Sequence, residues 1–261
     1  MNLFFLILLS VSSGFVFERS IPTTGAQVDV DELGNVYFVQ SRRVEKRDAT
    51  GKLLFQTADL NFGEITNLDL TNPLMPFLYY REQSKLVFFD NTLSQQGQAL
   101  DLFEKGFLQV EYVCGSRGDS FWLWDARMSE LVRVDRQFET LSSTGNLGVL
   151  LGLTLSPSQL FERGSSVYLI DKENGVLVFD VYGNYRTRLL IKSPYPMKVF
   201  DESLIYVSDD QLHILDRGWV EEESVNLPEK DWQAFSFWRG RLYLAGKADT
   251  RVFRFSETVK N

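Results

Sequence analysis

The chain has 261 residues, of which 44% are hydrophobic and 14% aromatic, and its formal net charge is -8. All-β folds of this length often form one domain, and aromatic residues favour strands because flat side chains pack well on a pleated surface. A nucleic-acid-binding protein needs a basic surface that displaces counterions from phosphates, so the acidic balance of this chain argues against that class.

The N-terminus carries a short apolar run. Residues 3–11 read LFFLILLSV and are followed by Ser-Ser-Gly. This pattern is typical of a secretory signal peptide, and it is shorter than the about 20 residues that a membrane-spanning helix needs. We therefore predict a signal peptide over 1–14, a mature domain over 15–261 and an exported protein of the periplasm or outer envelope. Met-Asn at the start carries no Lys or Arg, so an uncleaved apolar segment and a misassigned start stay open.

One strand pattern recurs roughly every 40 residues, the length of a typical propeller repeat. The clearest copy runs from Val167 to Ile191, where Asn-Gly and Tyr-Gly-Asn turns separate three apolar strands. Asn-Gly between alternating apolar residues is the strongest short-range signal for a β-hairpin. The same frame starts again at Asn35, Phe77, Phe121, Leu204 and Arg241.

A further short strand precedes each copy of the frame. We place these strands at Gln27–Asp31, Leu68–Leu70, Gln109–Cys114, Ser158–Arg163, Met197–Phe200 and Ala234–Trp238. Six repeats of this strand pattern predict an all-β, six-bladed β-propeller with four-stranded blades, whose inner strands line a central channel.

Two residue types recur at equivalent positions of the frame. Asp ends the second strand in five copies, at Asp48, Asp90, Asp135, Asp180 and Asp216, and Ser256 takes its place in the sixth. Because Asp accepts hydrogen bonds from backbone N–H groups two residues on, we interpret these residues as turn-forming and not catalytic. The first strand carries an aromatic residue, at Tyr37, Tyr79, Trp122, Tyr168, Tyr206 and Tyr243. Such a stripe can serve as a carbohydrate platform, but we favour packing between adjacent blades.

The last repeat lacks an outer strand of its own. Arg251–Ser256 is its third strand, and only a short polar tail follows. Phe15–Arg19, by contrast, has strand character, precedes the first repeat and belongs to no blade. An open ring would expose unpaired strand edges, so we predict that Phe15–Arg19 pairs antiparallel with Arg251–Ser256 and completes blade six.

The connection between repeats three and four departs from the frame. Asn146–Leu155 reads NLGVLLGLTL, whereas other connections, such as ADLNFGEITN from Ala58, are polar. One interpretation is an extended fourth strand followed by a buried crossover. The other is an apolar lip that docks a partner, since contiguous exposed apolar surface often marks an interface. In that case the binding residues are Leu147, Val149, Leu150, Leu151 and Leu153, and the partner is another envelope protein.

Few residues suit catalysis or metal binding. Cys114 lies in an apolar stretch and has the character of a small buried hydrophobe. His213 is the only histidine, whereas a zinc site needs three or four converging ligands. Glu221–Glu223 is typical of a solvated edge strand, and the ligand-rich loop of a calcium site is missing. With no phosphate-binding loop, Gly-x-Ser-x-Gly or His-Glu-x-x-His motif, we predict no catalytic residue, no metal and no cofactor.

FDVYGNYRTRLLI, from Phe179 onward, resembles six-bladed propellers of the NHL and SMP-30 kind. VDELGNVYFV and NPLMPFLYYREQSKLVFFDNTLS resemble an uncharacterised family of exported propellers of the Bacteroidota cell envelope. The resemblance covers most of the mature chain and implies fold and compartment, but no assigned activity. SMP-30-like lactonases bind a divalent metal through an early Glu and later Asn and Asp residues, and NHL-type amidating lyases use a His-ligated zinc. Neither set of ligands is matched in this sequence.

These observations predict a non-catalytic exported propeller that acts as a protein-interaction or envelope-scaffold module. The alternative is an enzyme or small-ligand binder that works in the channel, such as a lactonase-like hydrolase. An enzyme should cluster three or more carboxylate or amide side chains over the axis. A scaffold should show scattered polar groups there and an apolar patch elsewhere. The oligomeric state does not follow from the sequence.

Overall fold

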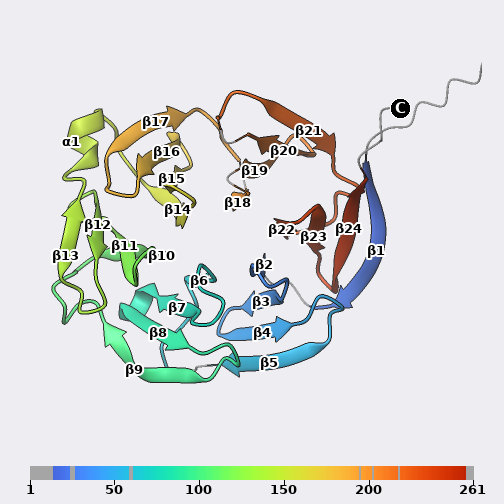
Figure 1. Cartoon of the computed structure of the whole chain (residues 1–261), viewed down its shortest axis with the longest axis horizontal. Helices are drawn as coiled ribbons and strands as arrows, with labels where there is room; N and C mark the ends of the chain where they lie inside the picture. The colour runs from blue at the N-terminus through green and yellow to red at the C-terminus, as the bar shows by residue number, and fades with distance from the viewer. Residues whose placement is uncertain are drawn as a thin grey trace, which may run out of the picture.

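The computed structural model describes residues 14–23, 27–58, 61–193, 195–201, 203–216 and 218–256. Six four-stranded antiparallel sheets stand around a central axis like the blades of a propeller (Figure 1). In each blade the first strand lies nearest the axis and the fourth forms the outer rim. The predicted all-β, six-bladed fold is therefore confirmed.

The strands follow one another from the axis outward. Blade one contains β2 (Gln27–Val30), β3 (Val36–Gln40), β4 (Arg43–Arg47) and β5 (Leu53–Ala58). Blade two contains β6 (Asn67–Asp69), β7 (Phe77–Tyr80), the 3-10 helix η1 (Arg81–Gln83), β8 (Lys85–Phe89) and β9 (Gln95–Asp101). Blade three contains β10 (Val110–Ser116), β11 (Ser120–Asp125), β12 (Glu130–Val134) and β13 (Thr140–Ser143).

Helix α1 (Leu147–Leu151) links blades three and four. Blade four contains β14 (Pro157–Arg163), β15 (Ser166–Asp171), β16 (Gly175–Asp180) and β17 (Tyr185–Leu189). Blade five contains β18 (Lys198–Phe200), β19 (Ser203–Ser208), β20 (Gln211–Leu215) and β21 (Glu222–Asn226). Blade six contains β22 (Ala234–Trp238), β23 (Arg241–Ala245), β24 (Asp249–Ser256) and β1 (Gly14–Pro22). The two helices of the described residues, α1 and η1, are too short to cross a bilayer.

The first strand of the chain closes the ring, as the sequence predicts. β1 pairs antiparallel with β24, with Phe15 opposite Phe255 and Ser20 opposite Arg251, and the register shifts at a bulge between Phe17 and Arg19. Near its end, β1 places Ile21 in the apolar core between blades six and one. The N-terminal strand therefore completes blade six and also contributes to the next blade junction.

The recurrent Asp residues hold the turns between the third and fourth strands of blades one to five. Each of the five carboxylates accepts hydrogen bonds from two backbone N–H groups at 2.8–3.0 Å. In four blades the donors lie two and four residues on, and in the longer turn after Asp216 they are Val220 and Glu221. The turn-forming interpretation is confirmed.

The aromatic stripe packs between blades. All six aromatic side chains are buried, and each belongs to an apolar cluster shared by two neighbouring blades. Six such clusters occupy the six blade junctions of the described residues. Cys114 lies in the cluster between blades three and four, and burial raises the pKa of its thiol. The packing role of the stripe and the buried position of Cys114 agree with the sequence analysis.

The closing strand can be tested at one buried side chain. Replacing Ile21 with Ala should lower the free energy of unfolding by about 2–5 kcal/mol, because it leaves a cavity between blades six and one. Val16→Ala on the exposed part of the same strand should change it by about 0.5 kcal/mol or less. Urea unfolding curves measure both, and equal effects would contradict a packed closing strand.

The turn carboxylates predict the response to acid. Hydrogen bonds, led by that from the Thr92 hydroxyl, hold the pKa of Asp90 below its ordinary value. A lowered folded-state pKa means that the ionised carboxylate stabilises the fold above the unfolded pKa of about 3.9, and that this contribution is lost as the pH falls. The melting temperature of Asp90→Asn should thus lie below that of the parent at pH 7. The difference should shrink below pH about 4, and a gap independent of pH would contradict this account.

Candidate functional site

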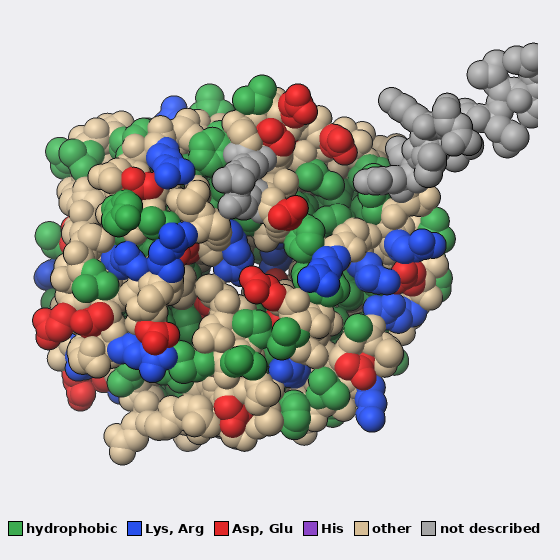
Figure 2. Space-filling view, viewed as in Figure 1, with side chains coloured by type: hydrophobic (Ala, Val, Ile, Leu, Met, Phe, Trp, Pro, Cys, Tyr) green, Lys and Arg blue, Asp and Glu red, His purple; other side chains and the backbone are tan. Residues whose placement is uncertain are grey.

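The central channel forms a cavity with a volume of about 790 Å³. Inner strands of all six blades contribute to its lining, Tyr112 being the contribution of blade three. Figure 2 shows an opening at the centre of the disc with Lys and Arg side chains on both sides of it. The lining alternates between apolar side chains and polar groups, so the chemistry available depends on which polar groups remain unpaired.

Two polar contacts connect blades that are not neighbours. Lys198 Nζ of blade five lies 2.7 and 2.8 Å from the carboxylate oxygens of Asp29 in blade one, so this ion pair passes in front of blade six. Arg163 Nη1 of blade four donates to Thr71 Oγ1 of blade two at 2.8 Å, in front of blade three. Blades three and six lie opposite each other, so the channel is bridged on both sides.

Three of the carboxylates that line the channel, those of Asp29, Asp31 and Asp69, are already engaged, whereas Glu32 and Asp201 are exposed. Asp31 accepts hydrogen bonds from the backbone of Leu33 and Asn35, the Asn35 amide and the Tyr37 hydroxyl. Asp69 accepts from the backbone N–H groups of Thr71 and Gly115 at 2.8 and 2.9 Å. These side chains hold loops in place and do not converge over the axis. Within the described ranges, no group of three or more His, Cys, Asp or Glu residues is arranged to hold a metal ion.

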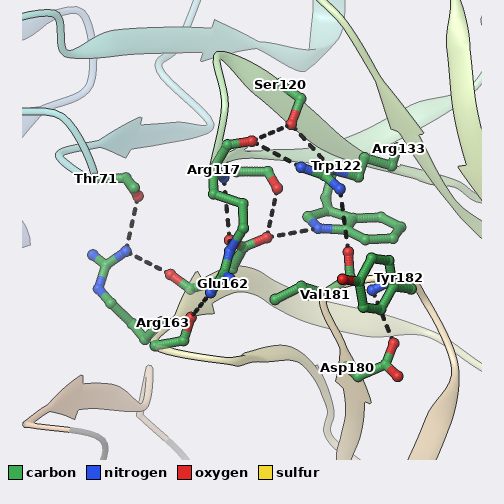
Figure 3. Close-up of polar contacts among 12 residues, drawn as sticks. Thr71, Arg117, Ser120, Trp122, Arg133, Glu162, Arg163, Asp180, Val181 and Tyr182 are labelled. Carbon is green, nitrogen blue, oxygen red and sulfur yellow. Dashed lines mark hydrogen bonds and ion pairs between the residues drawn. The ribbon is translucent and has the colours of Figure 1, made fainter.

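A buried carboxylate joins blades three and four near the channel. Glu162 accepts hydrogen bonds from Ser116 Oγ at 2.6 Å and from Trp122 Nε1 at 2.9 Å (Figure 3). The Arg117 backbone N–H donates at 3.2 Å, and the Arg117 guanidinium lies 3.6 Å away. Glu162 lies within the inner strand predicted over Ser158–Arg163, but its residue type and position in the sequence indicate no role. Its partners lie more than 35 residues away, so only the blade contact identifies it.

The predicted lip is a capped helix, and the extended strand considered as the alternative is wrong. Blade three ends with β13, and α1 follows it because Asn146 caps the helix by accepting the Val149 N–H at 2.8 Å. The Asn146 amide also donates to the Met128 carbonyl at 2.8 Å, which ties the helix to blade three. The helix ends at Gly152 in the left-handed conformation.

The five predicted binding residues divide into two groups. Leu147 is only 2% exposed and belongs to the core, and Leu151 and Leu153 pack partly against it. Val149 and Leu150 are 81% and 64% exposed. The buried crossover considered as one alternative therefore fits Leu147, Leu151 and Leu153. The exposed side chains that a lip requires are those of Val149 and Leu150.

The single histidine is engaged within blade five. His213 Nδ1 lies 2.6 Å from Glu222, whose other oxygen accepts the Tyr206 hydroxyl at 2.8 Å. The His213 ring also stacks on Tyr206, and its Nε2 lies 3.3 Å from Ser208 Oγ. None of these residues lines the channel, and we assign them to holding β19, β20 and β21 together. Glu222 and Glu223 lie on the exposed outer strand β21, as expected of a solvated edge strand.

Comparisons with known proteins support the fold alone. No family model matches the chain, and no curated protein does. Among solved structures, a streptogramin B lyase superposes with a TM-score of 0.64 at 10% identity, over 93% of this chain and 98% of the lyase. A protein of unknown function from Bacteroides thetaiotaomicron gives 0.66 at 12% identity, over 94% and 73%. BamB from Moraxella catarrhalis gives 0.53 at 12%, over 95% and 100%. At these identities the likeness defines the chain as a β-propeller and carries no activity to it.

The buried carboxylate predicts a measurable loss of stability. Glu162→Gln keeps the size of the side chain but removes the negative charge that accepts three hydrogen bonds. It should therefore lower the unfolding free energy by about 2–3 kcal/mol. Glu173→Gln is the matched control, because Glu173 is exposed and pairs only loosely with Lys192. It should change stability by about 0.5 kcal/mol or less. Chemical unfolding monitored by tryptophan fluorescence gives both values. An unchanged unfolding free energy in Glu162→Gln would contradict the structural role that we assign to Glu162.

Proposed function

We propose that this protein is a non-catalytic, exported propeller that binds another protein of the cell envelope through the exposed side of α1. The observation that carries the proposal is the pair Val149 and Leu150, which project from a helix held at both ends. Apolar side chains in this position contribute little to the chain's own core. Contiguous exposed apolar groups on a rigid support are a frequent feature of protein interfaces.

The charge pattern around the lip supports this assignment. No Asp, Glu, Lys or Arg occurs between Glu139 and Glu162, although 24% of the chain is charged. The centre of a protein interface is depleted of charged residues because desolvating them is unfavourable. Met128 adds a further exposed apolar side chain next to the helix cap. The lip thus combines exposure, rigidity and the absence of charge.

The channel gives less support to the alternative of a lactonase-like hydrolase or small-ligand binder. Asp31 and Asp69 hold loops, and Asp29 is paired with Lys198. A hydrolase of this kind would need several carboxylate or amide groups converging on one point. A binding propeller without a catalytic centre fits this lining better.

The compartment and the family are further parts of the proposal. The signal peptide predicted over 1–14, which lies almost wholly outside the described residues, would direct the protein to the periplasm or outer envelope. A cut near Gly14 would leave β1 intact and the ring closed. The resemblance to exported Bacteroidota propellers points to the same compartment, and the resemblance to NHL and SMP-30 propellers concerns the fold.

The lip is tested by comparing exposed and buried positions of the same helix. The double variant Val149→Ser, Leu150→Ser should keep the parent's unfolding free energy within about 0.5 kcal/mol. Leu147→Ala should lower it by about 2–5 kcal/mol. A photo-crosslinking residue at position 150 should capture a defined envelope protein that position 33, an exposed site on the channel rim, does not. The purified partner should bind the double variant at least about tenfold more weakly, equivalent to about 1.4 kcal/mol.

Two results would contradict the proposed function. One is equal capture from positions 150 and 33, which would mean that the crosslinker reports general proximity. The other is unchanged affinity of the double variant for the captured protein. Loss of stability in the double variant would instead show that the two side chains belong to the core.

A further inference from the structure

Three arginines meet at the seam where the first strand closes the ring. Their guanidinium groups lie 3.1 Å (Arg19), 2.9 Å (Arg241) and 3.4 Å (Arg254) from the carboxylate of Glu18. They come from β1, β23 and β24, three neighbouring strands of blade six. Figure 2 shows Lys and Arg side chains gathered on the side of the disc where these strands lie in Figure 1. We name Arg19, Arg241 and Arg254 the arginine cluster.

A β-bulge allows Glu18 and Arg19 to reach the same place. Phe17 pairs with Phe253 and Arg19 pairs with Val252, so Glu18 is the extra residue of β1. Successive side chains of a regular strand point to opposite faces of the sheet. A bulge breaks this alternation and re-aims a side chain. Glu18 and Arg19 therefore contact each other although they are neighbours in the sequence.

The cluster carries an excess of positive charge. Burial acts to raise the pKa of Glu18, but the hydrogen bond and charge of Arg241, together with the charges of the other two arginines, hold it below its ordinary value. Glu18 is therefore ionised at neutral pH and offsets one positive charge of the cluster. Among the described residues, the ion pairs of the cluster involve no other carboxylate. Arg251 of the same strand β24, by contrast, has a carboxylate of its own, that of Glu229 at 2.6 Å.

The pairing of β23 with β24 is unfavourable at this point. Arg241 lies directly opposite Arg254 in the register of the two strands. Like charges directly opposite each other on antiparallel strands destabilise a sheet. Glu18 compensates for this repulsion only in part, because it faces three guanidinium groups with one charge. Departures from the usual rules of strand pairing are expected at functional sites, where a ligand supplies the missing interaction.

We propose that the arginine cluster binds a phosphate group. Its two remaining positive charges match such a group, which carries about -1.5 to -2 at pH 7. Guanidinium suits phosphate because its planar fork donates two parallel hydrogen bonds. The side chains of Arg241 and Arg254 are 36% and 62% exposed, so a ligand reaches them from solvent. A phosphate group held here would also connect β1 to β23 and β24 and so stabilise the closed ring.

Titration of the full chain with inorganic phosphate tests the site. Calorimetry at constant ionic strength should show saturable binding at a single site. Arg254→Gln should weaken it at least about tenfold, because it removes a charged hydrogen-bond donor. Glu18→Gln should tighten it, because it removes the carboxylate that competes with phosphate for the arginines. Arg42→Gln is the matched control and should bind like the parent, because Arg42 is exposed in blade one, between β3 and β4.

Thermal melting separates a ligand site from a purely structural cluster. In chloride, Arg254→Gln should melt at or above the temperature of the parent, because it removes a like charge from the strand pair. Phosphate should raise the melting temperature of the parent and of Arg42→Gln, but not that of Arg254→Gln. A fall in melting temperature of Arg254→Gln in chloride, without any effect of phosphate on the parent, would show that the cluster only holds the strands together.

Lipid vesicles identify the source of the phosphate group, because free phosphate and an anionic headgroup share this chemistry. Sedimentation with phosphatidylglycerol vesicles, reversed by inorganic phosphate and lost in Arg254→Gln, would assign a lipid headgroup. Binding of inorganic phosphate without binding to these vesicles would assign a soluble phosphate compound.

Two results of the titration would overturn the proposal. One is the absence of saturable phosphate binding, and the other is an equal effect of Arg254→Gln and Arg42→Gln. The lip on α1 plays no part in these measurements, so they succeed or fail independently of the proposed function.

Discussion

The pairing of β1 with β24 is the interaction on which the rest of the structure depends. Every other blade is a continuous stretch of chain, but blade six exists as a four-stranded sheet only because the first strand joins the last three. Without that strand, β24 would have a free edge, and the cluster between blades six and one would lose Ile21. Closure therefore combines backbone hydrogen bonds between β1 and β24, which come from opposite ends of the described chain, with apolar packing between blades six and one.

Polar side chains near the axis also hold the blades together. Asp29 with Lys198, and Arg163 with Thr71, each connect two blades across a third. Glu162 joins blades three and four through donors that come from a strand, a turn and an indole ring. Charged side chains that might have served a ligand are thus used to hold the ring together. The surface that remains free for recognition lies on α1 and at the arginine cluster of blade six.

Periodic features of the fold were predictable from the sequence, and isolated ones were not. Asp90 and Tyr79 recur with counterparts in the other blades, so one physical role explains a whole set of residues. Even the closing strand followed from counting strands. Helix α1 has no counterpart in the other blades, and its apolar residues are compatible with either a strand or a helix. The helix forms because Asn146 caps its N-terminus and Gly152 ends it in the left-handed conformation. Glu162 and Lys198 were missed as contacts because their partners lie in other blades, at separations that no local pattern records.

The closing strand also has a consequence for the order in which the molecule is made. Among the described strands β1 is made first and β24 last, so their pairing has the longest sequence separation in the fold. Contacts of this kind form slowly, because a long loop must close before they contribute. Blades one to five can each assemble as their own segment emerges, while the first strand stays without its partner throughout synthesis. A chain of this topology completes its ring only after its last strand has been made.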